Sequence, residues 1–194
     1  MVCASNMNRS MEAHALLQKR GFNVWSYGTG TNVKLPGPTA DQPNVYEFAT
    51  PYRQIYEQLR AQDEDLYSGN AVLRMLERNM AVKVAPERWQ ERAEPRKHFD
   101  VVLAFEERVF EAVLEDLQAR DAVELTPVHV MNLEVRDTHA DAAESGPLVL
   151  QLCEALESGF GEEAGEEATH PVQRVMETFE ERTGKRILYS PQLV

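Results

Sequence analysis

The chain has 194 residues, of which 43% are hydrophobic, enough for one domain with a full core. Its formal net charge is −12, whereas proteins that bind the phosphate backbone of nucleic acids present a basic face, so direct nucleic-acid binding is disfavoured. No apolar run of about 18 residues and no basic leader followed by an apolar stretch is present, which argues against a membrane span and a secretory signal. The two cysteines, Cys3 and Cys153, lie far apart, so the sequence predicts a reduced intracellular protein.

The expected elements alternate between strand and helix along the chain. Met1 and Val2 form the end of a strand, and a helix follows over 10–20, where Gly21 gives a natural stop. Further strands are expected over 22–28, 99–105, 127–135 and 186–190. Further helices are expected over 51–63, 66–80, 106–120, 141–157 and 172–183, and the Gly- and Pro-containing stretch 29–44 is expected to be a loop. This alternation predicts an α/β fold, with a parallel central sheet flanked by helices on both faces.

An acidic low-complexity insertion interrupts this pattern at about 158–168. The stretch 158–171, SGFGEEAGEEATHP, contains four acidic residues, three Gly and one Pro. We interpret it as a solvated insertion within one domain that covers 1–194, and an acidic interaction segment is the alternative.

The order of the elements predicts where a ligand would bind. Ligands of parallel α/β sheets lie beyond the carboxyl ends of the strands. This rule places three segments on one rim of the sheet: the loop at 3–10, the turn around Glu106 and the loop at 135–141.

The first of these segments, VCASNMNRSMEAH, has the residues of a nucleophilic phosphate site. If a strand, a loop and a helix follow one another here, the backbone N–H groups of residues 4–9 curl around one point and form an anion nest. Arg9 adds a forked donor that matches two phosphate oxygens. Cys3 lies at the floor, where the same donors favour a thiolate, and Ser10 can donate a hydrogen bond to it. The predicted chemistry is attack on phosphorus, a cysteinyl-phosphate and its hydrolysis. The alternative is an inert buried Cys3 beside a surface Arg9.

Dephosphorylation of serine also needs a general acid, because an alkoxide is a poor leaving group. Asp137, in the loop after the strand at 127–135, is the best placed carboxyl group. Glu134 and Asp141 are neighbours that could substitute, although Asp141 is better explained as a helix N-cap. Asp100 lies at the wrong end of its strand, and Glu106 is interpreted as a first-turn helix residue. No Cys/His set with metal spacing and no Gly-rich nucleotide loop is found, so neither a metal nor another cofactor is expected.

Seven blocks of the sequence together resemble one family, the RNA polymerase II C-terminal-domain phosphatases of the suppressor-of-SUA type. The blocks are VCASNMNRSMEAH, GFNVWSYGTGTNVKLPGP, NVYEF, NAVLRMLERN, PERWQ, FDVVLAFEERVF and PVHVMNLEV. The resemblance runs from residue 2 to about residue 157 and resumes in ETFEERTGKRILYS. It implies a fold similar to low-molecular-weight tyrosine phosphatases with extra helices, and a nuclear protein that needs no metal.

The resemblance also implies a function. Such a protein removes phosphate from serine in Ser-Pro sites of the polymerase heptad repeats, accepts the cis form of the Ser-Pro bond, and acts in transcription termination and mRNA 3′-end processing. A symplekin-like scaffold of the cleavage and polyadenylation machinery is the implied partner. Cys3 matches the nucleophile, Arg9 the phosphate clamp, Ser10 the hydroxyl beside the thiol and Asp137 the general acid. The implied substrate-binding residues are Ala4, Ser5, Asn6, Met7, Asn8, Lys34, Leu35, Pro36 and Met75.

Members of this family carry a full strand before the cysteine, so we expect that residues preceding Met1 are missing from the sequence. Two other functions stay open. A low-molecular-weight tyrosine phosphatase is disfavoured because its late Asp-Pro pair is absent. An inactive phosphopeptide-binding scaffold is disfavoured because each catalytic position is intact. An arsenate reductase is weaker still, since Cys153 is the one further thiol.

Overall fold

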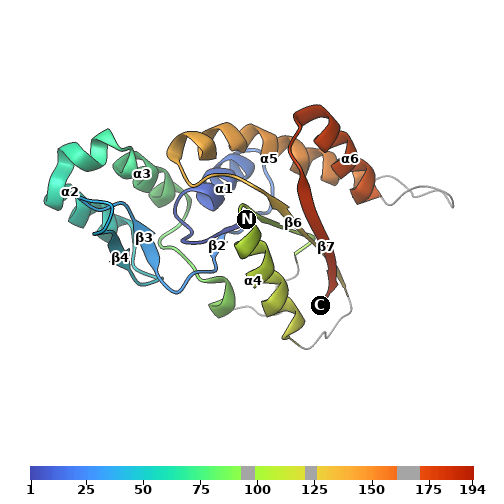
Figure 1. Cartoon of the computed structure of the whole chain (residues 1–194), viewed down its shortest axis with the longest axis horizontal. Helices are drawn as coiled ribbons and strands as arrows, with labels where there is room; N and C mark the ends of the chain where they lie inside the picture. The colour runs from blue at the N-terminus through green and yellow to red at the C-terminus, as the bar shows by residue number, and fades with distance from the viewer. Residues whose placement is uncertain (93–98, 121–125, 161–170) are drawn as a thin grey trace.

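The computed structural model describes residues 1–92, 99–120, 126–160 and 171–194, and five of its strands form one sheet (Figure 1). The order across this sheet is β2-β1-β5-β6-β7. The first four strands are parallel, and β7 pairs antiparallel with β6. Their bounds are Val2–Cys3 for β1, Tyr27–Gly28 for β2, Val101–Ala104 for β5, Pro127–Leu133 for β6 and Ile187–Leu193 for β7.

Helices cover both faces of the sheet, as the sequence predicts. Side chains alternate along β5, so that Leu103 faces one core while Val102 and Ala104 face another. The Leu103 core is covered by α1 (Arg9–Lys19), α5 (His139–Phe160) and α6 (Pro171–Thr183). The opposite core is covered by α4 (Glu107–Gln118) and the short helix η1 (Trp89–Glu91).

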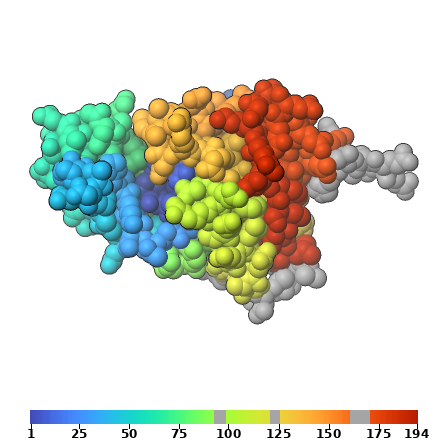
Figure 2. Space-filling model, in the orientation of Figure 1, coloured from blue at the N-terminus to red at the C-terminus, as the bar shows by residue number. Residues whose placement is uncertain are grey.

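A third core belongs to a lobe at one end of the molecule, drawn in blue to green in Figure 1. This helical lobe consists of α2 (Tyr52–Gly69), α3 (Val72–Val82) and a hairpin of β3 (Val33–Leu35) and β4 (Asn44–Tyr46). Its buried side chains pack around Met7 and Met11, so the lobe rests directly on the start of α1. Figure 2 shows a hollow between this lobe, α4 and the beginning of α5, with dark blue N-terminal residues at its floor.

Three of the elements expected from the sequence have different bounds in the structure. The strand expected over 22–28 is restricted to β2, because its ladder partner β1 offers only Val2 and Cys3. The expected loop 29–44 contains β3 and the start of β4, and its Gly and Pro content conceals this hairpin. The expected break after residue 63 is present as a kink at Asp63, whose Oδ1 accepts the N–H of Leu66, but the helix expected over 66–80 is itself divided, because α2 ends at Gly69 and α3 begins at Val72.

The expected parallel central sheet is confirmed, and β7 is added to its edge as an antiparallel strand. Two helices, α5 and α6, separate β6 from β7 in the chain. Two passes along the sheet return the chain to the end where β6 finished, so β7 runs in the opposite direction. The last strand accordingly spans Ile187–Leu193 rather than 186–190.

The acidic insertion expected at 158–168 falls almost wholly on residues 161–170, which lie outside the described residues. Residues 158–160 form the end of α5. None of the helices within the described ranges combines the length and the apolarity that crossing a membrane requires.

We predict that the buried imidazole of His14 in α1 makes stability depend on pH. His14 is 6% exposed, its Nδ1 lies 2.8 Å from the Ser26 hydroxyl, and burial is the main cause that lowers the pKa of His14 to about 4. An unfolded chain binds this proton near pH 6.5, so the contribution is complete above that pH and is lost as pH falls toward 4. Denaturant unfolding should show a loss of roughly 2 kcal/mol over this interval that is absent in His14→Gln. Identical slopes in the two proteins would contradict the prediction.

Candidate active site

The loop between β1 and α1 has the geometry of an anion-binding nest. Asn6 takes a left-handed conformation with φ of 53°, which asparagine tolerates better than most residues. Within the described part of the chain, the N–H groups of residues 5–8 have no acceptor, although this loop is largely buried. Helix α1 begins directly after them, at Arg9. Free amides and a helix N-terminus at one point form a site for an oxyanion.

The Cys3 thiol lies at the base of this loop and is 3% exposed. Its Sγ is 3.1 Å from the Ser10 hydroxyl. Asn6 Nδ2 donates to the same hydroxyl oxygen at 3.0 Å, and the N–H of Glu87 holds Asn6 by donating to its Oδ1. The Ser10 oxygen accepts from Asn6, so the Ser10 hydroxyl still has its own hydrogen to donate toward the sulfur.

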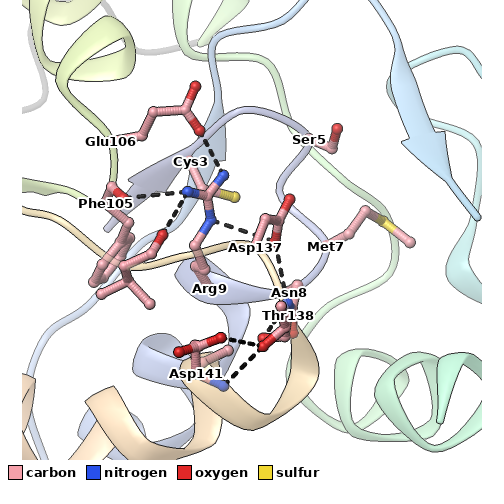
Figure 3. Close-up of polar contacts among 12 residues, drawn as sticks. Cys3, Ser5, Met7, Asn8, Arg9, Phe105, Glu106, Asp137, Thr138 and Asp141 are labelled. Carbon is pink, nitrogen blue, oxygen red and sulfur yellow. Dashed lines mark hydrogen bonds and ion pairs between the residues drawn. The ribbon is translucent and has the colours of Figure 1, made fainter. Parts of the chain in front are cut away.

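Arg9 is 3% exposed, so the alternative in which it is a surface cation is wrong. Its Nη1 donates to the carbonyls of Phe105 and Val135, at 3.2 and 2.9 Å, and its Nη2 donates to Glu106 at 2.8 Å (Figure 3). Its Nε has no hydrogen-bond acceptor among the described residues. A guanidinium has five N–H donors, so these three bonds leave two for a ligand. Two free donors on a rigid fork fit two oxygens of one phosphate.

Glu106 does not have the role that the sequence suggests. It stands at the N-cap of α4, but its side chain makes no capping hydrogen bond to the backbone of that helix, and its carboxylate accepts from the side chains of Arg9 and Arg108 instead. Partial burial opposes ionisation of Glu106, but these two cations outweigh it and lower its pKa. Burial likewise opposes the charge on Arg9, while Asp137, Cys3 and Glu106 outweigh it and raise the pKa of Arg9. Glu106 therefore fixes the orientation of the clamp.

The Asp137 carboxylate lies on the same rim and is 56% exposed. Its Oδ1 accepts a hydrogen bond from Asn8 Nδ2 at 3.1 Å and lies 3.4 Å from Arg9 Nε (Figure 3). The substitutes considered from the sequence are engaged elsewhere. Glu134 accepts the N–H of Glu107 at the start of α4. Asp141 is not the N-cap of α5 but the third residue of that helix; its N–H donates to the Thr138 hydroxyl, and its carboxylate accepts from that same hydroxyl.

A groove runs from the thiol into the helical lobe. It is lined by nine of the residues considered from the sequence, namely Cys3, Ser5, Met7, Asn8, Lys34, Leu35, Pro36, Met75 and Asp137. Ala4 and Asn6 do not line it, since Asn6 is fully buried and holds Ser10. Four lining residues were missed: Asn70, Ala71, Val72 and His139. The first three sit at the turn between α2 and α3, where the expected helix bounds were wrong. His139 is the first residue of α5.

The second cysteine lies away from this groove. Cys153 lines a different cavity, shared with Asp100 and Val101 at the amino end of β5. Burial raises the pKa of the Cys153 thiol to about 12, which keeps it protonated. A cysteine at the opposite end of the sheet is not placed to relay a disulfide with Cys3, so the arsenate reductase alternative loses its second thiol. Among the described residues, no three His, Cys, Asp or Glu side chains gather as a metal site.

Comparing the sequence and comparing the structure with known proteins both identify relatives of one kind. The chain is 43% identical over 190 residues to the human RNA polymerase II C-terminal domain phosphatase SSU72, covering 98% of this chain and 93% of that protein. It is 44% identical over 193 residues to the protein of that name from Dictyostelium discoideum, covering 98% and 86%. A crystal structure of D. melanogaster Ssu72 and Symplekin bound to a cis peptidomimetic CTD phospho-Ser5 peptide matches with a TM-score of 0.88 and 38% identity, covering 100% and 96% of the two chains.

The match therefore includes both the core sheet and the helical lobe. The family model described as Ssu72-like protein matches residues 1–194, the whole length of the sequence. The resemblance seen in the sequence blocks is confirmed, and this chain belongs to the Ssu72-like protein family.

Proposed function

We propose that this protein is a serine phosphatase that acts on Ser-Pro sites in the heptad repeats of the RNA polymerase II C-terminal domain. The observation that carries the proposal is the pair of unused Arg9 donors beside unpaired loop amides and the Cys3 thiol. These groups suit a phosphate whose phosphorus faces the sulfur. Relatives named as C-terminal domain phosphatases and the bound phospho-Ser5 peptidomimetic of the insect protein support the substrate.

The proposed reaction has two steps. The Cys3 thiolate attacks phosphorus, the bond from phosphorus to the serine oxygen breaks, and protonated Asp137 gives its proton to that oxygen. Water then attacks the cysteinyl-phosphate while Asp137 takes a proton from it, and the P–S bond breaks to release phosphate and the thiolate. Asp137 lies 3.4 Å from Arg9 Nε, so a phosphate bound by Arg9 would lie next to the carboxyl group that has to reach the leaving oxygen.

The groove accounts for selection of proline after the phosphoserine. Leu35, Pro36 and Met75 offer apolar surface next to the thiol, and Lys34 supplies a positive charge at the edge. A proline ring brought close to the phosphate by a cis peptide bond fits a short apolar groove better than an extended chain does. We further propose that the protein works in the nucleus, in transcription termination and mRNA 3′-end processing, with a symplekin-like scaffold as partner, as the insect complex supports.

The first test is phosphate release from two peptides. One is a polymerase heptad phosphorylated on a serine before proline, and the other carries phosphotyrosine. We expect release from the heptad peptide, and none from Cys3→Ser, which should still bind it. Release from the phosphotyrosine peptide alone would favour the tyrosine phosphatase alternative. Binding without release by the wild-type protein would favour the phosphopeptide-binding scaffold.

The role of Asp137 is tested by the leaving group. Asp137→Asn should lower kcat on the phosphoserine peptide by on the order of a hundredfold, and by less than about threefold on an activated aryl phosphate, which leaves without a proton. Glu134→Gln is the matched control. It removes a carboxylate of the same loop whose partner is the N–H of Glu107 at the start of α4. Equal losses on both substrates would assign the acid to another residue.

The clamp is tested by Arg9→Lys, which keeps the charge and removes the fork. We expect kcat/KM to fall by at least about a hundredfold on both substrates, because a point charge cannot engage two oxygens in one plane. Arg136→Lys, at an 84% exposed side chain on the same rim, should change nothing. Near-normal activity of a folded Arg9→Lys variant would refute the clamp.

A further inference from the structure

The carbonyl groups of the phosphate-binding loop are held from behind by side chains of the helical lobe. The Tyr52 hydroxyl donates to the carbonyl of Asn6 at 2.7 Å. Asn79 Nδ2 donates to the carbonyl of Met7 at 2.8 Å. Arg78 Nη2 donates to the carbonyl of Met7 at 2.9 Å and to that of Asn8 at 3.2 Å. The carbonyls of Asn6 and Met7 thus point into the lobe, and that of Asn8 is shared between Arg78 and the N–H of Glu12 in α1.

These three donors are themselves fixed in place. Tyr52 and Asn79 are fully buried, so water does not replace them. Burial, with Cys3 and Glu87 nearby, raises the pKa of Tyr52 well above its ordinary value, and its hydroxyl remains a donor. Arg78 is 18% exposed, forms a salt bridge with Glu12 of α1, and donates to Asn79 Oδ1 at 2.9 Å.

Because of the geometry of the peptide bond, these contacts to carbonyl groups also set the direction of the N–H groups in the loop. A trans peptide is planar, so its C=O and the N–H of the next residue point in opposite directions. Holding the carbonyls of Asn6, Met7 and Asn8 outward therefore directs the N–H groups of Met7, Asn8 and Arg9 toward the side where the oxyanion would lie.

We propose that Tyr52, Arg78 and Asn79 are positioning residues that preorganise the phosphate-binding loop. The inference rests on the proposed role of this loop in binding phosphate. A carbonyl oxygen near an anion site repels an arriving ligand unless it is already turned away and held there. The lobe supplies that restraint before substrate arrives, so binding does not have to reorganise the backbone.

The test measures the affinity of the purified protein for tungstate, a tetrahedral oxyanion that is not turned over, by calorimetry. Tyr52→Phe should weaken binding about tenfold, and Arg78→Gln by on the order of a hundredfold. Arg78→Lys should recover part of the loss, because an ammonium group can still donate to a carbonyl. The matched control is Arg74→Gln on the same helix, one turn earlier, where the side chain is exposed.

Melting temperatures separate positioning from folding. A purely structural role would lower the melting temperature but leave the tungstate affinity of the folded variants at the wild-type value, and that result would overturn the inference. If Arg78→Gln does not fold, the conservative Tyr52→Phe variant decides in the same way. Weaker tungstate binding by Arg9→Lys with unchanged binding by the Tyr52 and Arg78 variants would reject this inference and spare the proposed function. Failure of the wild-type protein to bind tungstate would reject both.

Discussion

The architecture around the site depends on one buried guanidinium. Arg9 starts helix α1, yet its donors reach carbonyls beyond the ends of β5 and β6 and the carboxylate at the start of α4. Arg9 itself follows β1, and its partners follow β5 and β6, so it joins the segments that leave three different strands at the carboxyl edge of the sheet. Removing it would leave two buried carbonyls without this donor, at about 1–3 kcal/mol for each unsatisfied group, and would leave Glu106 with Arg108 alone. The guanidinium that holds these segments together also presents two N–H donors without hydrogen-bond acceptors, which suit a phosphate.

A chain of net charge −12 builds its anion site from local dipoles and two buried cations. Unpaired loop amides, the start of α1, Arg9 and Arg78 all act over a few ångströms, where the low dielectric strengthens them. The excess of acidic residues acts over longer distances, where salt screens it. A net charge of this sign is therefore compatible with a small anion site.

Much of the site was predictable because its parts are close in sequence or follow strand ends. Cys3, Arg9 and Ser10 share one loop and one helix start, and Asp137 follows β6 at the edge where ligands bind. Glu106 was misassigned because a helix N-terminus also favours an acidic residue, and nothing in the sequence reveals that Arg9 competes for it. Arg78 was missed for a different reason: on an amphipathic helix, an arginine is expected on the solvent-facing side, and only the packing of the lobe buries it.

Helix α3 has two duties that lie one turn apart. Val72 and Met75 line the groove that would receive the peptide, while Arg78 and Asn79 hold the loop that would receive its phosphate. The lobe is consequently not an exchangeable module, since a graft that brings a new groove without these two donors also loosens the phosphate loop. Evolution of a new peptide preference in this architecture is channelled toward single replacements in the first turn of α3, because the next turn of the same face bears Arg78 and Asn79 and is constrained by the proposed chemistry.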